Sequence, residues 1–222
     1  MIIQLNDISK NFDRNYVLNN IDFEINRGEI AGIIGPNGSG KTTLLNIIMG
    51  LVKQNSGTIF YSDKNQINAA VSRKGFFGDM TVEKNLLLYA NLNNQSSLEV
   101  NRVLNLFEID FRNKKFSELS AGMKQRVSLA KVFMGDYNLV LLDEPTNHLD
   151  IDSIMNLRSA IQVRQNSGTA FLIASHILTE LERLCDYILF IREGKIVKRH
   201  SMNEISTDYL SLEDAYLKIS EQ

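Results

Sequence analysis

Hydrophobic residues in the N-terminal part of the chain gather in short clusters. The clusters at residues 2–8 and 17–25 predict two strands, which the polar stretch 13–15 separates. A third apolar run at residues 30–34 stops at a glycine-rich segment, and helical spacing follows from 42 to 49. The pattern therefore predicts two strands and then a strand, a glycine-rich loop and a helix, in that order.

The pattern changes twice in the rest of the chain. Between about residues 76 and 135 the apolar residues recur at helical spacing, which predicts a helical subdomain. Strand-like apolar runs then return at residues 139–142, 170–173 and 188–191. A helix is predicted at residues 151–164, between the first two runs. We expect a single domain over residues 1–222, with a parallel α/β core formed by 1–75 and 136–222.

Composition narrows the class of protein. With 222 residues and 44% hydrophobic content, the chain can bury a core without disulfides. Lysine and arginine number 24 against 26 aspartates and glutamates, so there is no broad basic surface and we expect no nucleic-acid partner. The lone cysteine, Cys185, has no internal disulfide partner, which fits a reducing compartment; buried packing is its simplest role.

The N-terminus and the apolar runs bear on location. The N-terminus lacks the basic and apolar regions of a secretory signal, which favours the cytoplasm. The longest apolar runs, 86–90 and 187–191, are far shorter than the roughly 20 residues of a membrane-spanning helix. We expect any membrane contact to be made through a partner.

The glycine-rich segment after the third strand carries the first candidate chemistry. Its residues match a P-loop: Gly35, Pro36, Asn37, Gly38, Ser39, Gly40, Lys41 and Thr42. In such a loop backbone N–H groups surround phosphates at a helix N-terminus, the lysine reaches the β- and γ-phosphates, and the Thr42 hydroxyl binds Mg²⁺. Thr43 can contact the α-phosphate region. A plain glycine-rich turn is the alternative, but the position between strand and helix favours ATP and Mg²⁺ as ligands.

Two adjacent carboxylates follow the apolar run at 139–142. Asp143 and Glu144 come at the carboxyl end of this predicted strand, where the ligand sites of α/β sheets form. Asp143 can hold Mg²⁺ directly or through water, and Glu144 lies where a base could polarise the attacking water. Such a pair alone is more often a solvated turn. Together with a P-loop it indicates a Walker B motif.

Residues 119–126, with the sequence LSAGMKQR, look like the signature motif of ATP-binding cassette (ABC) ATPases, and they precede the Walker B motif as that family requires. Taken alone, Ser120 could open a helix that grips an anion, or it could be an ordinary N-cap. The order of the three motifs resembles the ABC family. The resemblance implies an α/β P-loop NTPase fold with a mostly parallel RecA-like core, an N-terminal antiparallel β part and an inserted helical subdomain.

The resemblance also implies a composite site between two subunits. In the family the signature motif of one subunit, here Ser120 and Gly122, contacts the γ-phosphate held by the P-loop of another. We therefore expect a second cassette subunit, in a homodimer or a heterodimer. Residues 147–150 resemble the D-loop at that interface, which assigns Asp150 to the site. His176 matches the switch histidine that senses the γ-phosphate; a structural histidine is the alternative.

Other positions either match the family or depart from it. Phe12 resembles the aromatic residue that stacks on adenine, and core packing is the alternative. Ser72 stands where the Q-loop glutamine of the family is expected. This predicts that ATP hydrolysis is coupled to a transport partner more weakly or through different contacts. Ala121 and Met123 replace the commoner glycine and glutamine of the signature motif.

Two segments indicate the branch of the family. Residues 67–77 and 211–217 resemble drug-export and antibiotic-resistance cassettes, including bacitracin-resistance and lantibiotic-immunity ATPases. We expect an ATP-hydrolysing subunit that drives a separately encoded membrane permease, an exporter, from the cytoplasmic face. The alternative function is that of a soluble cassette acting on ribosomes or nucleic acid, because the sequence PTNHLD at residues 145–150 is common in translation-associated cassettes. A module that binds ATP without hydrolysis is disfavoured by Glu144 and His176.

Overall fold

The computed structural model describes residues 1–13, 15–70 and 75–220. Contacts among residues divide the chain into two compact units. The α/β unit comprises Met1–Val71, Asn138–Glu144 and Gln165–Gln222, and the helical unit comprises Ser72–Tyr137 and Pro145–Arg164. The predicted Q-loop position, Ser72, lies outside the described residues.

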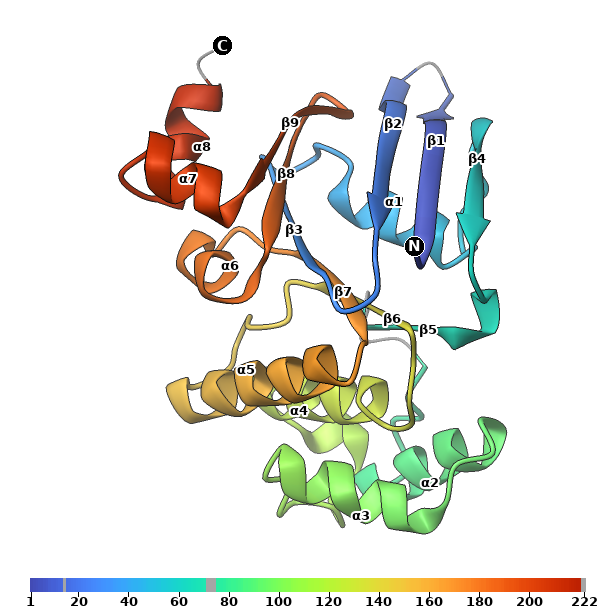
Figure 1. The fold of residues 1–222 in the computed structure, drawn as a ribbon. Helices are drawn as coiled ribbons and strands as arrows, with labels where there is room; N and C mark the ends of the chain where they lie inside the picture. Colours follow the sequence, from blue (N-terminus) through green and yellow to red (C-terminus); the bar gives the residue numbers. More distant parts are fainter. Residues whose placement is uncertain (14, 71–74, 221–222) are drawn as a thin grey trace. The chain divides into compact units, whose positions relative to one another are not determined.

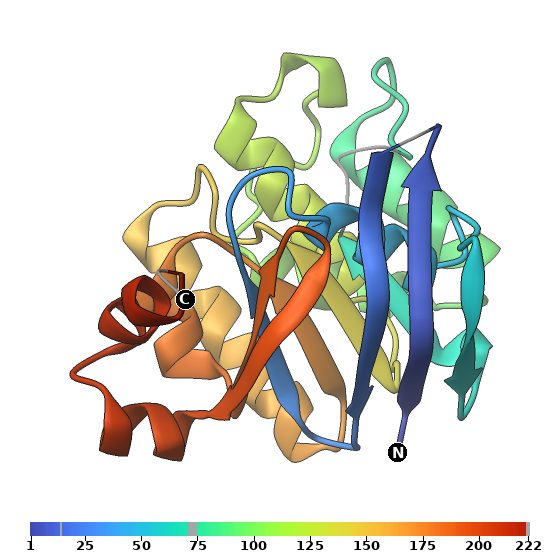
Figure 2. The same ribbon diagram turned by 90° about the horizontal axis from the view of Figure 1, so that it is seen from above.

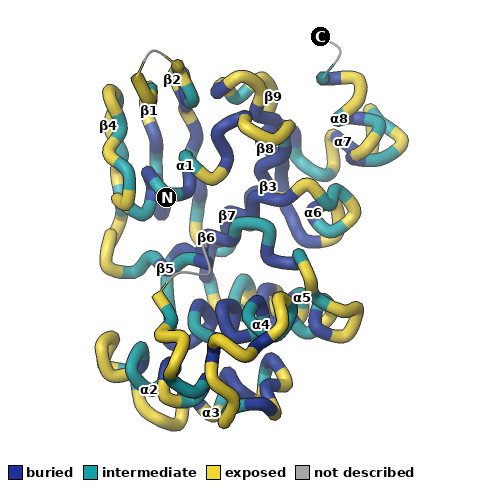
Figure 3. Tube along the Cα trace, turned by 180° about the vertical axis from the view of Figure 1, so that it is seen from behind, coloured by how far each residue is buried: buried dark blue, intermediate teal, exposed yellow. Residues whose placement is uncertain are grey.

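A six-stranded sheet forms the centre of the α/β unit (Figure 1), with the order β5-β6-β7-β3-β8-β9. The strands are β3 (Ile30–Ile34), β5 (Ile67–Ala70), β6 (Leu139–Asp143), β7 (Ala170–Ala174), β8 (Tyr187–Arg192) and β9 (Lys195–Ser201). All neighbouring strands are parallel except β9, which returns antiparallel to β8. Every residue of β3 and β7 is buried (Figure 3), as in parallel sheets covered on both faces. The predicted parallel α/β core is confirmed.

A second, antiparallel sheet of the α/β unit has the order β2-β1-β4 (Figure 2). It is built from β1 (Ile3–Phe12), β2 (Asn15–Ile25) and β4 (Ser56–Tyr61). Buried side chains of β1 and β2 share one hydrophobic core with α1 (Lys41–Ile48) and with strands of the parallel sheet. The antiparallel N-terminal part expected from the family resemblance is therefore present.

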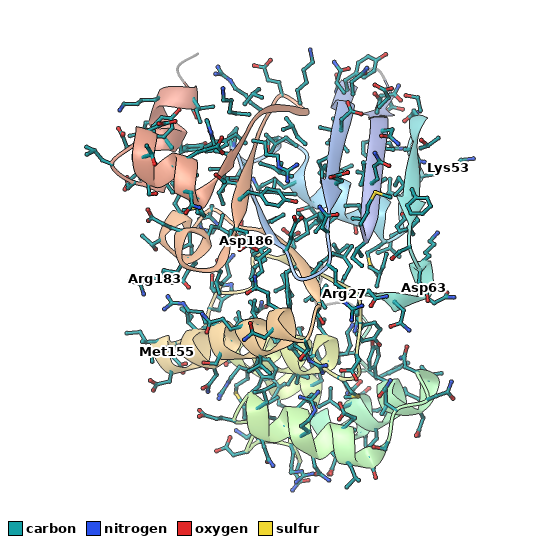
Figure 4. All side chains as sticks on the ribbon, in the orientation of Figure 1. Arg27, Lys53, Asp63, Met155, Arg183 and Asp186 are labelled. Atoms are coloured by element: carbon teal, nitrogen blue, oxygen red, sulfur yellow. The ribbon has the colours of Figure 1, made fainter. Side chains whose placement is uncertain are left out.

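Three further helices and one short turn complete the described α/β unit: α6 (Leu178–Leu184), α7 (Met202–Asp208), α8 (Leu212–Ser220) and the 3-10 turn Lys64–Gln66. The start of the parallel sheet is fixed by Asp186, labelled in Figure 4, whose carboxylate accepts hydrogen bonds from the Ile30 backbone N–H (2.7 Å) and the Gln165 amide (3.2 Å). Its neighbour Cys185 is a buried free thiol, and burial raises its pKa well above the usual range. None of the described helices has the length and apolar content to cross a bilayer.

The helical unit contains α2 (Val82–Leu92), α3 (Ser97–Leu106), the 3-10 turn Phe116–Glu118, α4 (Ala121–Val132) and most of α5 (Ile151–Asn166). Its boundary differs from the expected one, because residues 145–164 group with the helical unit and not with the core. Hydrogen bonds explain the difference. The Gln125 amide donates to the Pro145 carbonyl (2.9 Å), and the Arg164 guanidinium donates to the Gly135 carbonyl (2.8 Å) and pairs with Asp136.

Candidate nucleotide-binding site

The P-loop joins the end of β3 to the start of α1, and two of its glycines are required by their surroundings. A Cβ on Gly35 would lie 2.1 Å from the Ile191 carbonyl oxygen, so no side chain fits there. Gly40 precedes the helix with φ 105°, in the left-handed region, and a Cβ there would lie 2.7 Å from the Val17 carbonyl oxygen. The loop therefore passes close to the backbone of β8 and β2. No side chain caps α1, whose first turn has N–H groups without intrahelical acceptors, which suits an anion.

Lys41 lies across the inside of the loop. Its ammonium donates to the carbonyls of Gly35 (2.6 Å) and Pro36 (3.0 Å), and the residue is only 9% exposed. Burial lowers the pKa of Lys41, and the nearby charges of Glu144 and Asp143 oppose this shift. A cation at this position can bind phosphate, which is the role that the motif predicts for Lys41.

Thr42 and Asp143 face each other at the mouth of the loop. The Thr42 hydroxyl donates to a carboxylate oxygen of Asp143 at 2.7 Å. Burial raises the pKa of Asp143, with a smaller opposing effect from the Thr42 hydrogen bond, and the Glu144 charge raises it further. The structure thus brings the two predicted Mg²⁺ ligands together.

The donor set fits Mg²⁺. A hydroxyl and a carboxylate are hard oxygen ligands, and Mg²⁺ in nucleotide sites takes its remaining ligands from phosphates and water. The described residues contain no group of three or more His, Cys, Asp and Glu side chains that could hold a metal ion. Among the described side chains, the buried Ser39 hydroxyl is one of those without a hydrogen-bond partner, so the loop has polar capacity left for a ligand.

Glu144 and His176 form a pair at the carboxyl ends of β6 and β7. The Glu144 Oε2 lies 2.8 Å from His176 Nδ1 and accepts from the Ser175 hydroxyl at 3.3 Å. Glu144 has φ 49°, a left-handed conformation that is costly for a residue with a side chain, and its N–H donates to the Ala174 carbonyl at 2.8 Å. A carboxylate next to an imidazole can accept a proton from water. Both predicted catalytic residues therefore lie together beside the P-loop strand.

A cavity of about 540 Å³ connects these groups. It is lined by Phe12, Val17, Asn37, Gly38, Ser39, Gly40, Lys41, Thr42, Thr43, Asp143 and Glu144. Phe12 is 48% exposed, so its ring is not part of the core. The Lys10 ammonium lies 4.8 Å from the centre of that ring, an arrangement that favours a cation–π contact. The volume is in the range of small-molecule sites.

A second cavity of about 310 Å³ lies next to the P-loop, lined by Ile34, Gly35, Pro36, Asn37, Ser175, His176, Leu178 and Tyr216. Tyr216 belongs to α8, and it was not predicted as a site residue. The resemblance of residues 211–217 to antibiotic-resistance cassettes implies a terminal helix, and the structure has α8 there. The sequence of these residues does not indicate which surface the helix packs against.

The other predicted nucleotide contacts belong to the helical unit. Ser120 is the N-cap of α4, and its hydroxyl accepts from the Met123 N–H at 3.3 Å. Asp150 accepts from the Ser153 N–H at 2.9 Å at the start of α5, and this hydrogen bonding lowers the pKa of Asp150. Gly122 lies on α4 against the His148 carbonyl. The roles of these three residues toward the nucleotide of a second subunit stay predictions.

Comparison with known proteins identifies the family. The family model described as "ABC transporter" matches residues 18–147, which is more than half of the chain. The chain belongs to the ABC transporter family. It is 34% identical to the lantibiotic transport ATP-binding protein SrtF of Streptococcus pyogenes, over 88% of this chain and 89% of the relative.

Other members of the ABC family are similar over comparable lengths. The chain is 32% identical to the bacitracin transport ATP-binding protein BcrA of Bacillus licheniformis, over 94% of this chain and 71% of that protein. A solved structure of an ATP-binding subunit of an ABC transporter superimposes with a TM-score of 0.90 at 26% identity, covering 99% of this chain and 100% of the other. The resemblance to the antibiotic-resistance branch is confirmed.

Proposed function

We propose that this chain is the ATP-binding and ATP-hydrolysing subunit of an ABC transporter and that it powers a separately encoded membrane permease. The observation that carries the proposal is the arrangement around the 540 Å³ cavity, where the P-loop, the Thr42–Asp143 pair and Glu144 line one space. Each element of this arrangement has a task in phosphoryl transfer to water.

The residues of the site divide the work of hydrolysis. The backbone N–H groups of the P-loop and the Lys41 ammonium bind and orient the phosphates of ATP. Thr42 and Asp143 would hold Mg²⁺, which when bound supplies positive charge to the phosphate oxygens. Glu144 accepts the proton of the attacking water, and His176, 2.8 Å from its carboxylate, fixes the orientation of that carboxylate. Phe12 offers an exposed ring to the adenine.

The site becomes complete with a second cassette subunit. Ser120, Gly122 and Asp150 carry the matching motifs but belong to the helical unit, and we assign them to the nucleotide held by the partner cassette. ATP then joins two subunits, and hydrolysis separates them again. The partner is either a second copy of this chain or a related cassette.

The names of two relatives support an export direction. SrtF and BcrA are named for lantibiotic and bacitracin transport, and both compounds are antibiotics. We infer an exporter, with this chain bound to the cytoplasmic face of the membrane through its permease. We assign the substrate path to the permease.

Affinity purification from detergent-solubilised membranes tests the proposal. The tagged Glu144→Gln variant, held in the ATP-bound form, should retain a polytopic membrane protein in the presence of ATP, and a Lys41→Ala variant treated alike serves as the matched control. Recovery of ribosomal proteins in place of a membrane protein would contradict the transport function and leave the ATPase assignment intact.

A further inference from the structure

Gln125 is a buried polar residue on α4 whose role the nucleotide site does not explain. It is 6% exposed, and its side-chain amide donates to the Pro145 carbonyl at 2.9 Å. A buried amide is retained where its hydrogen bonds are made, because an unmade one is costly. Pro145 follows Glu144 directly in the chain. The hydrogen bond therefore fixes the backbone one residue beyond the proposed catalytic base.

The same face of α4 contacts this segment a second time. Gly122 lies three residues before Gln125, so both point to the same side of the helix. A Cβ on Gly122 would lie 2.5 Å from the His148 carbonyl oxygen, which shows how closely the helix approaches the backbone there. Helix α4 thus holds residues 145–148 at both ends, once by a hydrogen bond and once by close packing.

The segment held in this way has an unfavourable backbone. Glu144 has φ 49° and His148 has φ 65°, and both are residues with side chains in the left-handed region. Such conformations persist where the surrounding structure fixes them. Thr146, between them, is only 4% exposed. The backbone conformation at Glu144 therefore needs external support, and Gln125 supplies some of it.

We propose that Gln125 is a positioning residue for ATP hydrolysis, which acts by holding the Pro145 carbonyl and with it the backbone that directly follows Glu144. This inference rests on the proposed ATPase function. It assigns to the signature helix a role within its own subunit, separate from the expected contact of Ser120 and Gly122 with the nucleotide of the partner.

The substitution Gln125→Met tests the role, because it keeps the length of the side chain and removes the donor. We expect kcat to fall on the order of 10- to 100-fold, as for small misplacements of a catalytic group. KM for ATP should change less than about threefold, because the P-loop contacts are untouched. Ser128→Ala is the matched control. Ser128 lies one turn further along α4, and its buried hydroxyl has no hydrogen-bond partner in the described part of the chain, so kcat should not change.

A double-mutant cycle separates positioning from general damage to the fold. In single-turnover hydrolysis, adding Gln125→Met to Glu144→Gln should slow the remaining reaction less than about twofold, because the group being positioned is already lost. If the two losses multiply, or if Gln125→Met raises KM as much as it lowers kcat, the positioning role is wrong. If the methionine variant does not fold, Gln125→Glu, which keeps a polar side chain of equal length, takes its place in the same measurements of kcat and KM.

Different results would overturn the role of Gln125 and the proposed ATPase function. Wild-type kcat in Gln125→Met, with Glu144→Gln inactive, overturns the role of Gln125 alone. No hydrolysis by the wild-type protein overturns both this role and the proposed function.

Discussion

At the scale of single residues, the site combines groups that are stable only together. Lys41 is buried and Asp143 is partly buried, and burial shifts the pKa of each in the direction that favours its neutral form. The Thr42 hydroxyl and the opposite charges offset this cost in part. The nucleotide-free protein therefore keeps charged groups in an unfavourable environment, and we expect binding of Mg²⁺ and phosphate to relieve this.

The raised pKa of Asp143 predicts how the apo protein responds to pH. The pH window of interest runs from the ordinary aspartate pKa near 4 to the higher pKa of Asp143 in the folded protein. In this window the folded protein binds more protons at Asp143 than the unfolded chain does. The free energy of unfolding therefore falls as the pH rises through the window. Asp143→Asn should therefore raise the apo melting temperature at pH 7 by a few degrees, at about 2–4 °C per kcal/mol for this chain length.

Thermal melts of Asp143→Asn at several pH values check this expectation. The gain should shrink toward pH 3, and the stabilisation by ATP with Mg²⁺ should become smaller than in the wild type. Asp13→Asn, at an exposed position after β1, is the control. A lower apo melting temperature at pH 7 would show that Asp143 stabilises the empty site.

At the scale of elements, the sequence predicted those with strong apolar patterns. The strands β3, β6, β7 and β8 consist almost entirely of buried residues, and each was expected. Strand β4 was missed, because none of its residues is buried and its pattern alternates between partly and fully exposed. Most residues of β9 are polar and exposed, so it gave no strand signal either. Pairing with neighbours, which no local pattern encodes, makes both of them strands.

For the site too, local features were predicted from the sequence and tertiary contacts were not. The P-loop and the Walker B pair were found because their chemistry lies in consecutive residues. The contact of Gln125 with Pro145 joins positions 20 residues apart in the sequence, and only the fold brings them together. Tyr216 was missed for the same reason, since α8 meets the P-loop cavity only through tertiary packing.

Helix α2 is fixed at its start by one buried side chain, Asn85. Its carbonyl accepts from the Phe77 N–H (2.7 Å), and its amide donates to the carbonyls of Phe77 (3.0 Å), Met80 (3.2 Å) and Thr81 (3.1 Å). Asn85→Ala should cost about 2–4 kcal/mol, because it removes the four hydrogen bonds of a buried side chain and takes away the acceptor of the Phe77 N–H. Urea unfolding measures the loss, and hydrogen exchange at Phe77 should accelerate.

Asn91→Ala is the control for this substitution, because Asn91 is exposed on the same helix. Alanine favours helix, so this variant should be neutral or slightly more stable. Equal unfolding midpoints for Asn85→Ala and the wild type would mean that the loop before α2 does not depend on the Asn85 contacts.

At the scale of the whole molecule, the proposed site is divided between the two units of the chain. The P-loop, Asp143, Glu144 and His176 belong to the α/β unit, whereas Ser120, Gly122 and Asp150 belong to the helical unit. In the proposed function, two subunits combine these sets on one ATP. Because Ser72 stands where the Q-loop glutamine of the family is expected, we predict that Ser72→Gln changes the ATPase rate or its stimulation by the permease.

Phosphate release and molar mass, measured with and without ATP for the wild type and Glu144→Gln, test the central claim most directly. The account predicts that the wild type hydrolyses ATP in the presence of Mg²⁺. Glu144→Gln should bind ATP with similar affinity, lose on the order of 100-fold or more in turnover, and form a dimer with ATP but not with ADP. Hydrolysis by Glu144→Gln at the wild-type rate would contradict the assignment of Glu144 as the base.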